Sequence, residues 1–382
     1  MKILVLTKRQ YMGKDLLDNR FGRFRELPLE LARLGHQVQG LSLSYRRRDE
    51  NCRTDASPTG DAQVQWQSIN LLSGFMPGLR NYFERARQML KEFQPDLIWA
   101  VSDAFHGIFG ARLSREFRTK CVIDFYDNFE AFTATRVPGV LSMFRSSVKR
   151  ADGATFFSQR MADYVIQTYP LHKRHTIILN GVRKDLFYPQ DQQACRQQLG
   201  LPADARVIGV AGALDASRGI DTLFSAFKIL APQDTKLHLA LAGPRGAKQK
   251  IPSGPRVHDF NSLSHEDVPT FLNALDVAVI CYRHSAQGEY SFPQKAYEII
   301  ACRVPLIAAA VGSMNELLRN YPQCLYDAED STSLADAIQR QLQAKTIIET
   351  AAPSWADSAK QLSDFFQQIV GGDSRSVVTQ KA

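Results

Sequence analysis

The stretch Val207-Ile-Gly-Val-Ala-Gly212-Ala-Leu-Asp-Ala-Ser-Arg218-Gly219 decides the fold of the second half of the chain. It opens with a short apolar run typical of a buried strand, and residues 221–230 then have the apolar spacing of a helix. A glycine-bearing loop between a strand and a helix directs backbone N–H groups and the positive helix end at an anion. Arg218 adds a guanidinium fork. This pattern predicts a diphosphate-binding loop; a glycine turn beside a surface arginine is the alternative interpretation.

Strands and helices alternate on both sides of this stretch. We expect further strands over 237–241, 277–280 and 306–310, and in the first half over 3–6, 38–43, 97–101, 121–125, 153–157 and 176–179, with helices over 21–34 and 79–93. Such alternation is typical of parallel sheets covered by helices. The sequence therefore predicts an α/β protein with two Rossmann-like parallel-sheet domains, whose strand ends face a central cleft where ligands of such folds bind.

Length and composition agree with two domains. The chain has 382 residues, 44% of them hydrophobic and 23% charged, which suffices for two globular cores and excludes wholesale disorder. A polar, glutamine-rich stretch over 183–206 is expected to be a linker with one short helix. We therefore expect domains over 1–185 and 186–353, a last helix over about 354–370, and a flexible tail over 371–382.

Positive charge is concentrated in the first half. Residues 1–180 carry 27 Lys and Arg against 18 Asp and Glu, whereas residues 181–382 carry 20 against 21. A basic domain beside a neutral one indicates an anionic partner such as phosphate, nucleic acid or membrane headgroups, or else a solubilising surface. We find no helix-turn-helix, zinc-finger spacing or aromatic–basic RNA motif, so nucleic acid is not expected.

The expected helix over 79–93 has an apolar stripe flanked by basic residues. Such a helix can lie on an anionic membrane, and a core helix with a solvated basic face shows the same pattern. The run Arg46-Arg47-Arg48 and the basic and apolar residues of 136–150 add to this picture. We therefore expect peripheral contact between the first domain and an anionic membrane.

Other features of the sequence concern the cellular compartment of the protein and the binding of metal ions. The longest uncharged apolar runs, such as 304–312, fall short of the roughly 20 residues that a membrane span needs, and the N-terminal apolar stretch is too short for a signal peptide. We therefore expect a cytoplasmic protein, at most at the inner face of the cytoplasmic membrane. The six cysteines lack metal-ligand spacing and no Asp-x-Asp pair occurs, so neither disulfides nor a metal ion are expected.

Several short motifs follow one another along the chain. They are the opening strand over 2–6 with Gly22 and Gly35-His36, the strand over 152–158, Asn180-Gly181-Val182 with Phe187 and Pro189, the loop over 212–219, Ser291-Phe-Pro-Gln-Lys295-Ala-Tyr-Glu298, Val311-Gly-Ser-Met-Asn-Glu316, and Trp355 in a last helix. In this order they resemble the nucleotide-sugar-dependent glycosyltransferases of family 4, whose two-Rossmann architecture is called GT-B. The resemblance implies an acceptor-binding first domain, a donor-binding second domain, and a last helix that crosses back onto the first.

The resemblance also implies roles for residues of the second domain. Arg218 stands where the family has a lysine before a glycine, and is expected to bind the donor diphosphate. Glu298 matches a glutamate that accepts hydrogen bonds from ribose hydroxyls, and a carboxylate suits this role because it can accept from two vicinal hydroxyls. The other residues expected at the donor site are Gly212, Gly219, Tyr290, Ser291 and Lys295.

The chain departs from the family's pattern at three places. Ala213 stands where the family has an arginine, so one cation of an expected pair is missing. The family's first glutamate, which touches the sugar, aligns with Tyr290, and the available acid, Glu289, lies one residue earlier. Either the loop carries one extra residue, or Glu289 does not touch the sugar. The family's histidine in a His-Asp pair is replaced in Tyr126-Asp127. These changes affect the sugar contacts more than the nucleotide contacts.

Candidate acceptor-site residues follow the strands of the first domain. His106 could orient a sugar hydroxyl or accept its proton, although a histidine in this position is more often structural. His106, Asp127 and Glu289 are the catalytic candidates. Gly22, Asp103 and Tyr126 are the candidates for acceptor or N-terminal loop contacts.

The resemblance implies a retaining glycosyltransferase without metal or cofactor, which moves a sugar from a nucleotide-diphosphate donor to a glycan or lipid-linked acceptor. Bacterial envelope polysaccharide or lipopolysaccharide biosynthesis is the expected setting. Arg218, the loop amides and a helix dipole would stabilise the charge on the leaving diphosphate. A nucleotide-sugar epimerase of the same fold and a non-catalytic basic binding protein remain alternatives.

Overall fold

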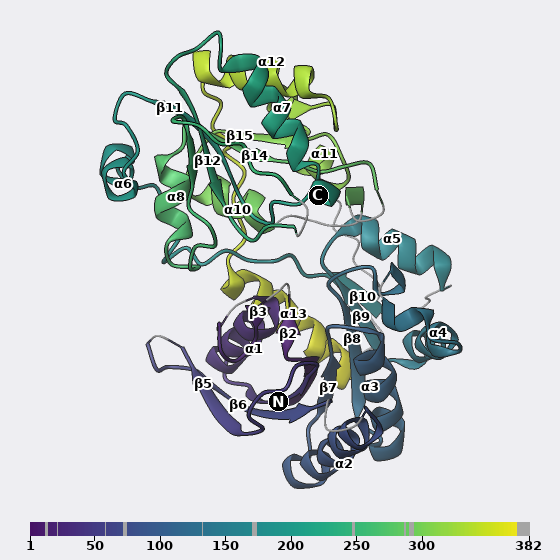
Figure 1. The fold of residues 1–382 in the computed structure, drawn as a ribbon. Coiled ribbons are helices and arrows are strands. Elements are labelled where there is room, and N and C mark those ends of the chain that lie inside the picture. Colours follow the sequence, from purple (N-terminus) through teal and green to yellow (C-terminus); the bar gives the residue numbers. More distant parts are fainter. Residues whose placement is uncertain are drawn as a thin grey trace. The chain divides into compact units, whose positions relative to one another are not determined.

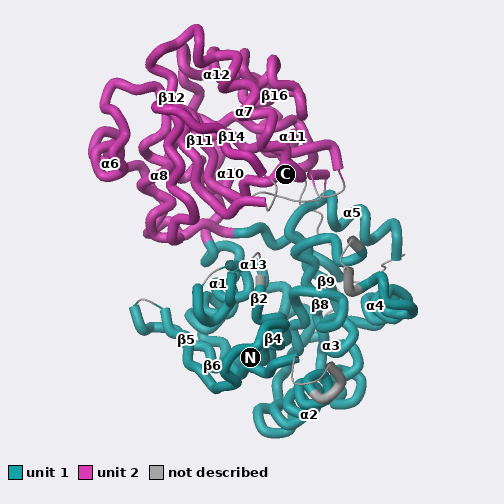
Figure 2. Tube along the Cα trace, viewed as in Figure 1, with its two compact units in different colours: residues 1–180, 355–382 teal, residues 181–354 magenta. Residues whose placement is uncertain are grey.

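The computed structural model describes residues 1–11, 14–20, 22–57, 59–71, 75–131, 133–169, 174–246, 249–285, 288–289 and 294–372. The chain divides into two units (Figure 2). The first holds the residues up to Asn180 together with the described residues from Trp355 onward, and the second holds Gly181–Ser354. The chain therefore leaves the first unit once and returns to it with its last helix.

The first unit contains an eight-stranded sheet in the order β10-β9-β8-β7-β1-β4-β6-β5. Its strands are β1 (Lys2–Lys8), β4 (Gln37–Ser44), β5 (Cys52–Ala56), β6 (Gln63–Asn70), β7 (Leu97–Ala100), β8 (Lys120–Phe125), β9 (Gly153–Phe156) and β10 (Arg174–Ile177), beside a hairpin of β2 (Gln10–Tyr11) and β3 (Lys14–Asp15). Its helices are α1 (Arg23–Arg33), α2 (Phe75–Phe93), α3 (Ala104–Phe117), α4 (Val140–Arg150), α5 (Gln159–Thr168) and α13 (Trp355–Val370), with 3-10 turns at Phe129–Ala131 and Thr133–Arg136. Neighbouring strands are parallel except β5, which runs antiparallel to β6.

The central strands β1, β7 and β8 are buried on both faces, which explains why they read as nearly continuous apolar runs. Alternate residues of β1 point to opposite faces. Ile3 and Val5 lie in one core with residues of α1 and α13, and Leu4 and Leu6 lie in another with residues of α2 and α3. Helices α1 and α13 lie side by side on the first face (Figure 1).

The second unit contains a six-stranded, wholly parallel sheet in the order β13-β12-β11-β14-β15-β16. Its strands are β11 (Arg206–Ala211), β12 (Leu237–Ala242), β13 (Val257–Asp259), β14 (Val277–Ile280), β15 (Leu306–Ala309) and β16 (Leu325–Tyr326). Its helices are α6 (Gln192–Leu199), α7 (Ile220–Leu230), α8 (Val268–Ala274), α10 (Gln294–Ala301), α11 (Ser313–Leu317) and α12 (Ser331–Gln343), with 3-10 turns at Ala216–Arg218 and Pro322–Cys324. The expectation of two Rossmann-like parallel sheets is therefore confirmed.

Each sheet has one place where the strand order reverses. In the first unit the chain builds outward from β1 to β4 and β6, then returns to the other side of β1 with β7. In the second unit it builds from β11 to β12 and β13, then returns beside β11 with β14. Ligands of open α/β sheets bind at the carboxyl ends of the strands at such switch points. The ends of β1 and β7, and of β11 and β14, are therefore the places to look for a site.

The residues expected to form a linker belong to the second unit. Cys195 and Leu201 lie in its hydrophobic core. Gln192 Nε2 donates to the Leu275 carbonyl oxygen at 2.7 Å, and Arg196 Nη2 donates to Asp276 Oδ2 at 2.6 Å. The polar side chains that suggest a linker thus form hydrogen bonds to the connection between α8 and β14.

The amphipathic pattern of α2 is explained by core packing. Tyr82, Ala86, Met89 and Leu90 are at most 3% exposed and belong to the core between α2 and the sheet. Arg80 forms an exposed ion pair with Glu84 on the outer side. Of the two interpretations of this helix, the one with a buried apolar stripe and a solvated basic face is confirmed.

Candidate functional site

The loop between β11 and α7 is held by a close backbone approach. Gly212 follows β11 and Gly243 follows the neighbouring β12, and a Cβ on Gly243 would lie 1.7 Å from the Gly212 carbonyl oxygen. Gly243 also has φ +143°, so only glycine fits there. Asp215 caps the 3-10 turn Ala216–Arg218, and Gly219, with φ +77°, turns the chain into α7. The expected strand–loop–helix unit is therefore present, and the eleven-residue α7 begins directly after the loop.

Arg218 lies where the loop meets the residues that follow β14. Its Nη1 donates to the Tyr282 hydroxyl at 3.3 Å, and its guanidinium carbon lies 6.0 Å from the centroid of that ring. Arginine has five N–H donors. Within the described part of the chain, no other hydrogen bond from this guanidinium is recorded. Half-buried Arg218 therefore combines a fixed position at the β11–β14 switch point with donors available to an anion.

Arg283 is a residue of this site that the sequence did not reveal. Its Nε donates to the Ala216 carbonyl oxygen at 2.6 Å, and its Nη2 donates to both carboxylate oxygens of Asp221 at 2.8 Å. It also pairs with Glu329. Arg283 thus ties the loop to the first turn of α7, across more than sixty residues of sequence. No local pattern signals contacts of this range.

Helix α10 places a cation against the same loop and carries a buried carboxylate one turn further along. A Cβ on Gly212 would lie 3.3 Å from Lys295 Cε, so the lysine side chain lies against the Gly212 backbone. Glu298, one turn further along α10, is 4% exposed. Its carboxylate accepts no hydrogen bond from any described residue, and His265 Nε2 lies 3.8 Å from its Oε1. Burial raises the pKa of Glu298, and the charge of Lys295 partly opposes this shift.

Of the other residues expected at the donor site, Tyr290 and Ser291 lie outside the described residues. Glu289 is described, and its Oε1 lies 3.8 Å from His284 Nδ1 with about a third of the side chain exposed. Its backbone is close to Gly312, where an added Cβ would lie 2.7 Å from the Glu289 carbonyl oxygen. A sugar-binding role for Glu289 stays a prediction.

In the first unit, Asp103 lies just after β7 and caps α3. One carboxylate oxygen accepts from the His106 backbone N–H at 3.1 Å and lies 2.7 Å from His106 Nδ1, and the other accepts from the Tyr45 hydroxyl at 2.7 Å. Burial opposes ionisation, but His106, Lys8 and Tyr45 together hold the pKa of Asp103 well below its usual range. His106 is fully buried against the edge of Tyr82. This burial fits the structural interpretation of His106; a catalytic role stays a prediction.

Lys8, the last residue of β1, contacts one of the residues expected at the acceptor site, Tyr126. Its Nζ donates to the Tyr126 hydroxyl at 2.7 Å. Burial lowers the pKa of Lys8, against the opposing charges of Asp103 and Asp127. The half-buried Asp127 accepts from the Asn128 backbone N–H at 2.7 Å. The ends of β1, β7 and β8 therefore gather Lys8, Asp103, Tyr126 and Asp127, and Lys8 could have been found as the last residue of a strand at a switch point.

Gly22 begins α1 and is followed by a fully buried arginine. Gly22 has φ +92°, and its carbonyl oxygen accepts the first helical hydrogen bonds. Arg23 is 0% exposed, and its Nη2 and Nε donate to the two oxygens of the equally buried Asp124 at 2.8 and 3.0 Å. Its Nη1 donates to the Ile178 carbonyl oxygen and to Asn180 Oδ1. Arg23 thus fixes the end of β10 and the asparagine of the Asn-Gly-Val motif.

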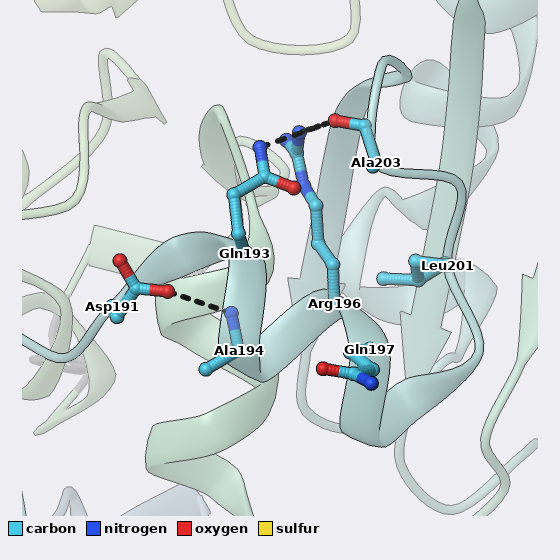
Figure 3. A pocket seen from close by; sticks show the side chains of 7 residues that line it. All are labelled: Asp191, Gln193, Ala194, Arg196, Gln197, Leu201 and Ala203. Carbon is cyan, nitrogen blue, oxygen red and sulfur yellow. Dashed lines mark hydrogen bonds between the residues drawn. The ribbon is translucent and has the colours of Figure 1, made fainter.

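A hollow of about 500 Å³ beside α6 carries no comparable chemistry (Figure 3). Of its lining residues, Asp191 accepts from the Ala194 backbone N–H and caps α6. Arg196 and Gln193 both point at the Ala203 carbonyl oxygen. These polar groups hold the helix in place, so we do not assign a ligand to this hollow.

Among the described residues, no group of three or more His, Cys, Asp or Glu side chains could hold a metal ion. No helix in the described ranges is both long enough and apolar enough to cross a membrane.

Comparison with known proteins gives matches over both units. Residues 23–186 match the family Glycosyltransferase Family 4, and residues 205–344 match Glycosyl transferases group 1. The D-inositol 3-phosphate glycosyltransferase of Nocardioides sp. is 28% identical over 228 residues, which cover 51% of this chain and 48% of that protein. The enzyme of the same name from Mycobacterium tuberculosis strain F11 is 31% identical over 183 residues, covering 44% and 36%. The matches thus span half or less of the length of these curated relatives.

Solved structures match over nearly the whole chain. Sucrose-phosphate synthase from Thermosynechococcus elongatus has a TM-score of 0.77 at 21% identity, covering 97% of this chain and all of that one. Anabaena HepE in complex with UDP-glucose has a TM-score of 0.67 at 20% identity, covering 97% and 99%. At these identities the likeness shows the fold, which is of GT-B type. With one matching family in each unit and this fold, the chain belongs to the family 4 glycosyltransferases.

Proposed function

We propose that this protein is a retaining glycosyltransferase that uses a nucleoside-diphosphate sugar as donor. The observation that carries the proposal is that Arg218 lies in, and Lys295 against, one loop at the β11–β14 switch point, with the buried Glu298 one turn along α10 from Lys295. Cations and helix N–H groups suit a diphosphate, and a buried carboxylate without a donor suits a pair of hydroxyls. UDP-glucose is the first donor to test, because HepE, which shares the fold, has been solved with it.

In this reaction the bond between the anomeric carbon and the diphosphate oxygen breaks, and an acceptor oxygen bonds to that carbon. The acceptor proton passes to the leaving diphosphate, whose negative charge grows in the transition state. Arg218 and the α7 N-terminus stabilise that charge. A covalent sugar–enzyme intermediate would need a second carboxylate about 5 Å from the first. We propose instead that the acceptor attacks from the face that the diphosphate leaves, without such an intermediate.

We propose that the first unit binds a glycan or lipid-linked acceptor, as in bacterial envelope polysaccharide or lipopolysaccharide biosynthesis. The ends of β1, β7 and β8 offer carboxylates and a phenol that can orient sugar hydroxyls. The basic character of residues 1–180 and the exposed Val137 and Met143, near Arg136, support peripheral contact with an anionic membrane.

Glu298→Gln tests the nucleotide assignment. The dissociation constant for a nucleoside diphosphate is expected to rise at least tenfold, because a charged hydrogen bond to the ribose is lost, whereas that for inorganic pyrophosphate stays within about twofold. Isothermal titration calorimetry with both ligands measures the two constants. Equal losses for both ligands would remove the ribose role.

Glu298→Gln is expected to stabilise the ligand-free protein at neutral pH, although it weakens nucleotide binding. A buried carboxyl with a raised pKa binds its proton more tightly in the folded state, so stability falls as pH rises through the interval between the unfolded and folded pKa values. Glu298→Gln removes this loss, and its unfolding temperature at pH 7 is expected to exceed that of the wild type. Thermal unfolding from pH 4 to pH 8 measures the difference, which should vanish at the acidic end.

A further inference from the structure

The loop over residues 212–219, called the donor loop here, has a single cationic side chain for a diphosphate ligand. Ala213 is exposed and uncharged, and Arg218 is the one basic residue in the segment 212–219. A diphosphate carries more than one negative charge, and one N–H of Arg218 already donates to the Tyr282 hydroxyl. A second cation has to come from another element of the fold.

Lys295 reaches the loop from α10. A Cβ added to Gly212 would lie 3.3 Å from its Cε and 3.6 Å from its Cδ, so the methylene chain lies over the Gly212 backbone. Gly212 itself is held by its neighbour Gly243 and by a 2.7 Å hydrogen bond from its N–H to the Ala242 carbonyl oxygen. The loop is therefore a fixed surface, and half-buried Lys295 lies against the residue directly before Ala213.

Glu298 is an independent sign that a ligand belongs beside Lys295. It lies three residues further along α10, on the same side of the helix. It is 4% exposed without a hydrogen-bond donor from the described residues, a costly arrangement unless a ligand supplies one. A cation and a buried acceptor one turn apart suit a ligand with phosphate at one place and hydroxyls at the next. A nucleoside diphosphate has this pattern.

We propose that Lys295 supplies the second cation of the diphosphate site and takes over the charge that Ala213 lacks. This inference rests on the proposed donor site in the second unit. It assigns the phosphate contacts to two elements: Arg218 acts from the loop that follows β11, and Lys295 acts from the helix that follows β14. Gly212 then has a second role, because a side chain there would crowd the Lys295 methylene chain.

Titration of inorganic pyrophosphate and UDP into wild type and Lys295→Gln tests the proposal. Loss of one charged hydrogen bond is expected to weaken binding of both ligands by about 10- to 100-fold, and Lys295→Arg is expected to retain most of the affinity. Ala213→Arg in the Lys295→Gln background should recover at least tenfold, since it returns a cation to the loop. Lys228→Gln, an exposed lysine on α7, is the matched control and should leave both affinities unchanged.

The outcomes separate this inference from the proposed function. If wild type binds UDP and pyrophosphate and Lys295→Gln binds them equally well, Lys295 is not a phosphate ligand, while the donor site stands. If Ala213→Arg fails to recover affinity although Lys295→Gln has lost it, the claim that the two positions substitute for each other is wrong. If wild type binds neither ligand, the donor site itself falls and this inference with it. Unfolding temperatures of the ligand-free variants show whether each is folded.

Discussion

Asp124→Ala is expected to lower the free energy of unfolding of the first unit by about 3 to 5 kcal/mol. The change leaves the Arg23 guanidinium fully buried without its carboxylate. The remaining acceptors, the Ile178 carbonyl oxygen and Asn180 Oδ1, are neutral and cannot balance the charge. Thr155 Oγ1 also loses its partner, since it donates to Asp124 at 2.5 Å. Removing one member of a buried pair costs far more than the pair itself contributes.

Urea unfolding followed by tryptophan fluorescence measures this loss. All three tryptophans, Trp66, Trp99 and Trp355, are buried in the first unit, so the signal reports on that unit. Replacing both Arg23 and Asp124 with leucine should cost less than Asp124→Ala alone. Asp61→Ala, which breaks the exposed pair with Arg33, is the surface control and should have a much smaller effect. A loss for Asp124→Ala no larger than for Asp61→Ala would refute the account of the buried pair.

Gly243→Ala is expected to destabilise the second unit by about 2 to 4 kcal/mol and to weaken nucleoside diphosphate binding at least tenfold. The added Cβ would lie 1.7 Å from the Gly212 carbonyl oxygen, closer than any non-bonded contact allows. The ends of β11 and β12 must separate to admit it. Since Gly212 opens the donor loop and touches Lys295, that movement displaces the proposed phosphate ligands.

Gly254→Ala is the matched control for this effect. Gly254 has φ +146°, close to the +143° of Gly243, but an added Cβ there would meet no atom within 4 Å. It therefore carries the backbone strain without the collision. Scanning calorimetry and titration with a nucleoside diphosphate compare the two variants. Equal losses in both would show that left-handed backbone strain, and not the contact with Gly212, explains the result.

The strands that could be predicted from sequence are those buried on both faces. β14, expected over 277–280, is an uninterrupted apolar run that follows Asp276, and the structure has the strand at Val277–Ile280. β6 was missed because only alternate residues, such as Val64 and Trp66, face the core, while glutamines occupy the other positions. Its antiparallel partner β5 is polar and has one buried residue, Asp55, so no apolar pattern predicts that strand.

Helix α3 was missed for a tertiary reason. It contains Gly107 and Gly110, which lower helix propensity. An added Cβ at Gly110 would lie 2.6 Å from Ala100 Cβ, and one at Gly107 would lie 2.8 Å from the Phe144 ring. The helix lies so close to the sheet and to α4 that larger residues do not fit. Packing across the fold, which the local sequence does not display, outweighs the propensity.

The residues of the candidate site also divide into those that a local sequence pattern identifies and those that it does not. Gly212, Arg218 and Gly219 could be named in advance because they share one short loop with a recognisable pattern. Arg283 could not, because its partners lie far away in sequence, as in the bond from its Nε to the Ala216 carbonyl oxygen. Contacts of this kind depend on strand order, which the sequence does not state.

The central claim is that the second unit binds a nucleoside-diphosphate donor around Arg218. The most direct measurement is a thermal-shift panel of UDP, GDP, ADP, CDP and their common sugar conjugates, without added metal, on wild type and Arg218→Ala. A ligand at about 100 times its dissociation constant stabilises the protein by about 2.7 kcal/mol, which is readily seen. We expect one nucleoside diphosphate to stand out and Arg218→Ala to lose most of that shift while keeping its ligand-free unfolding temperature. No shift with any member of the panel, or a shift that survives in Arg218→Ala undiminished, would contradict the account.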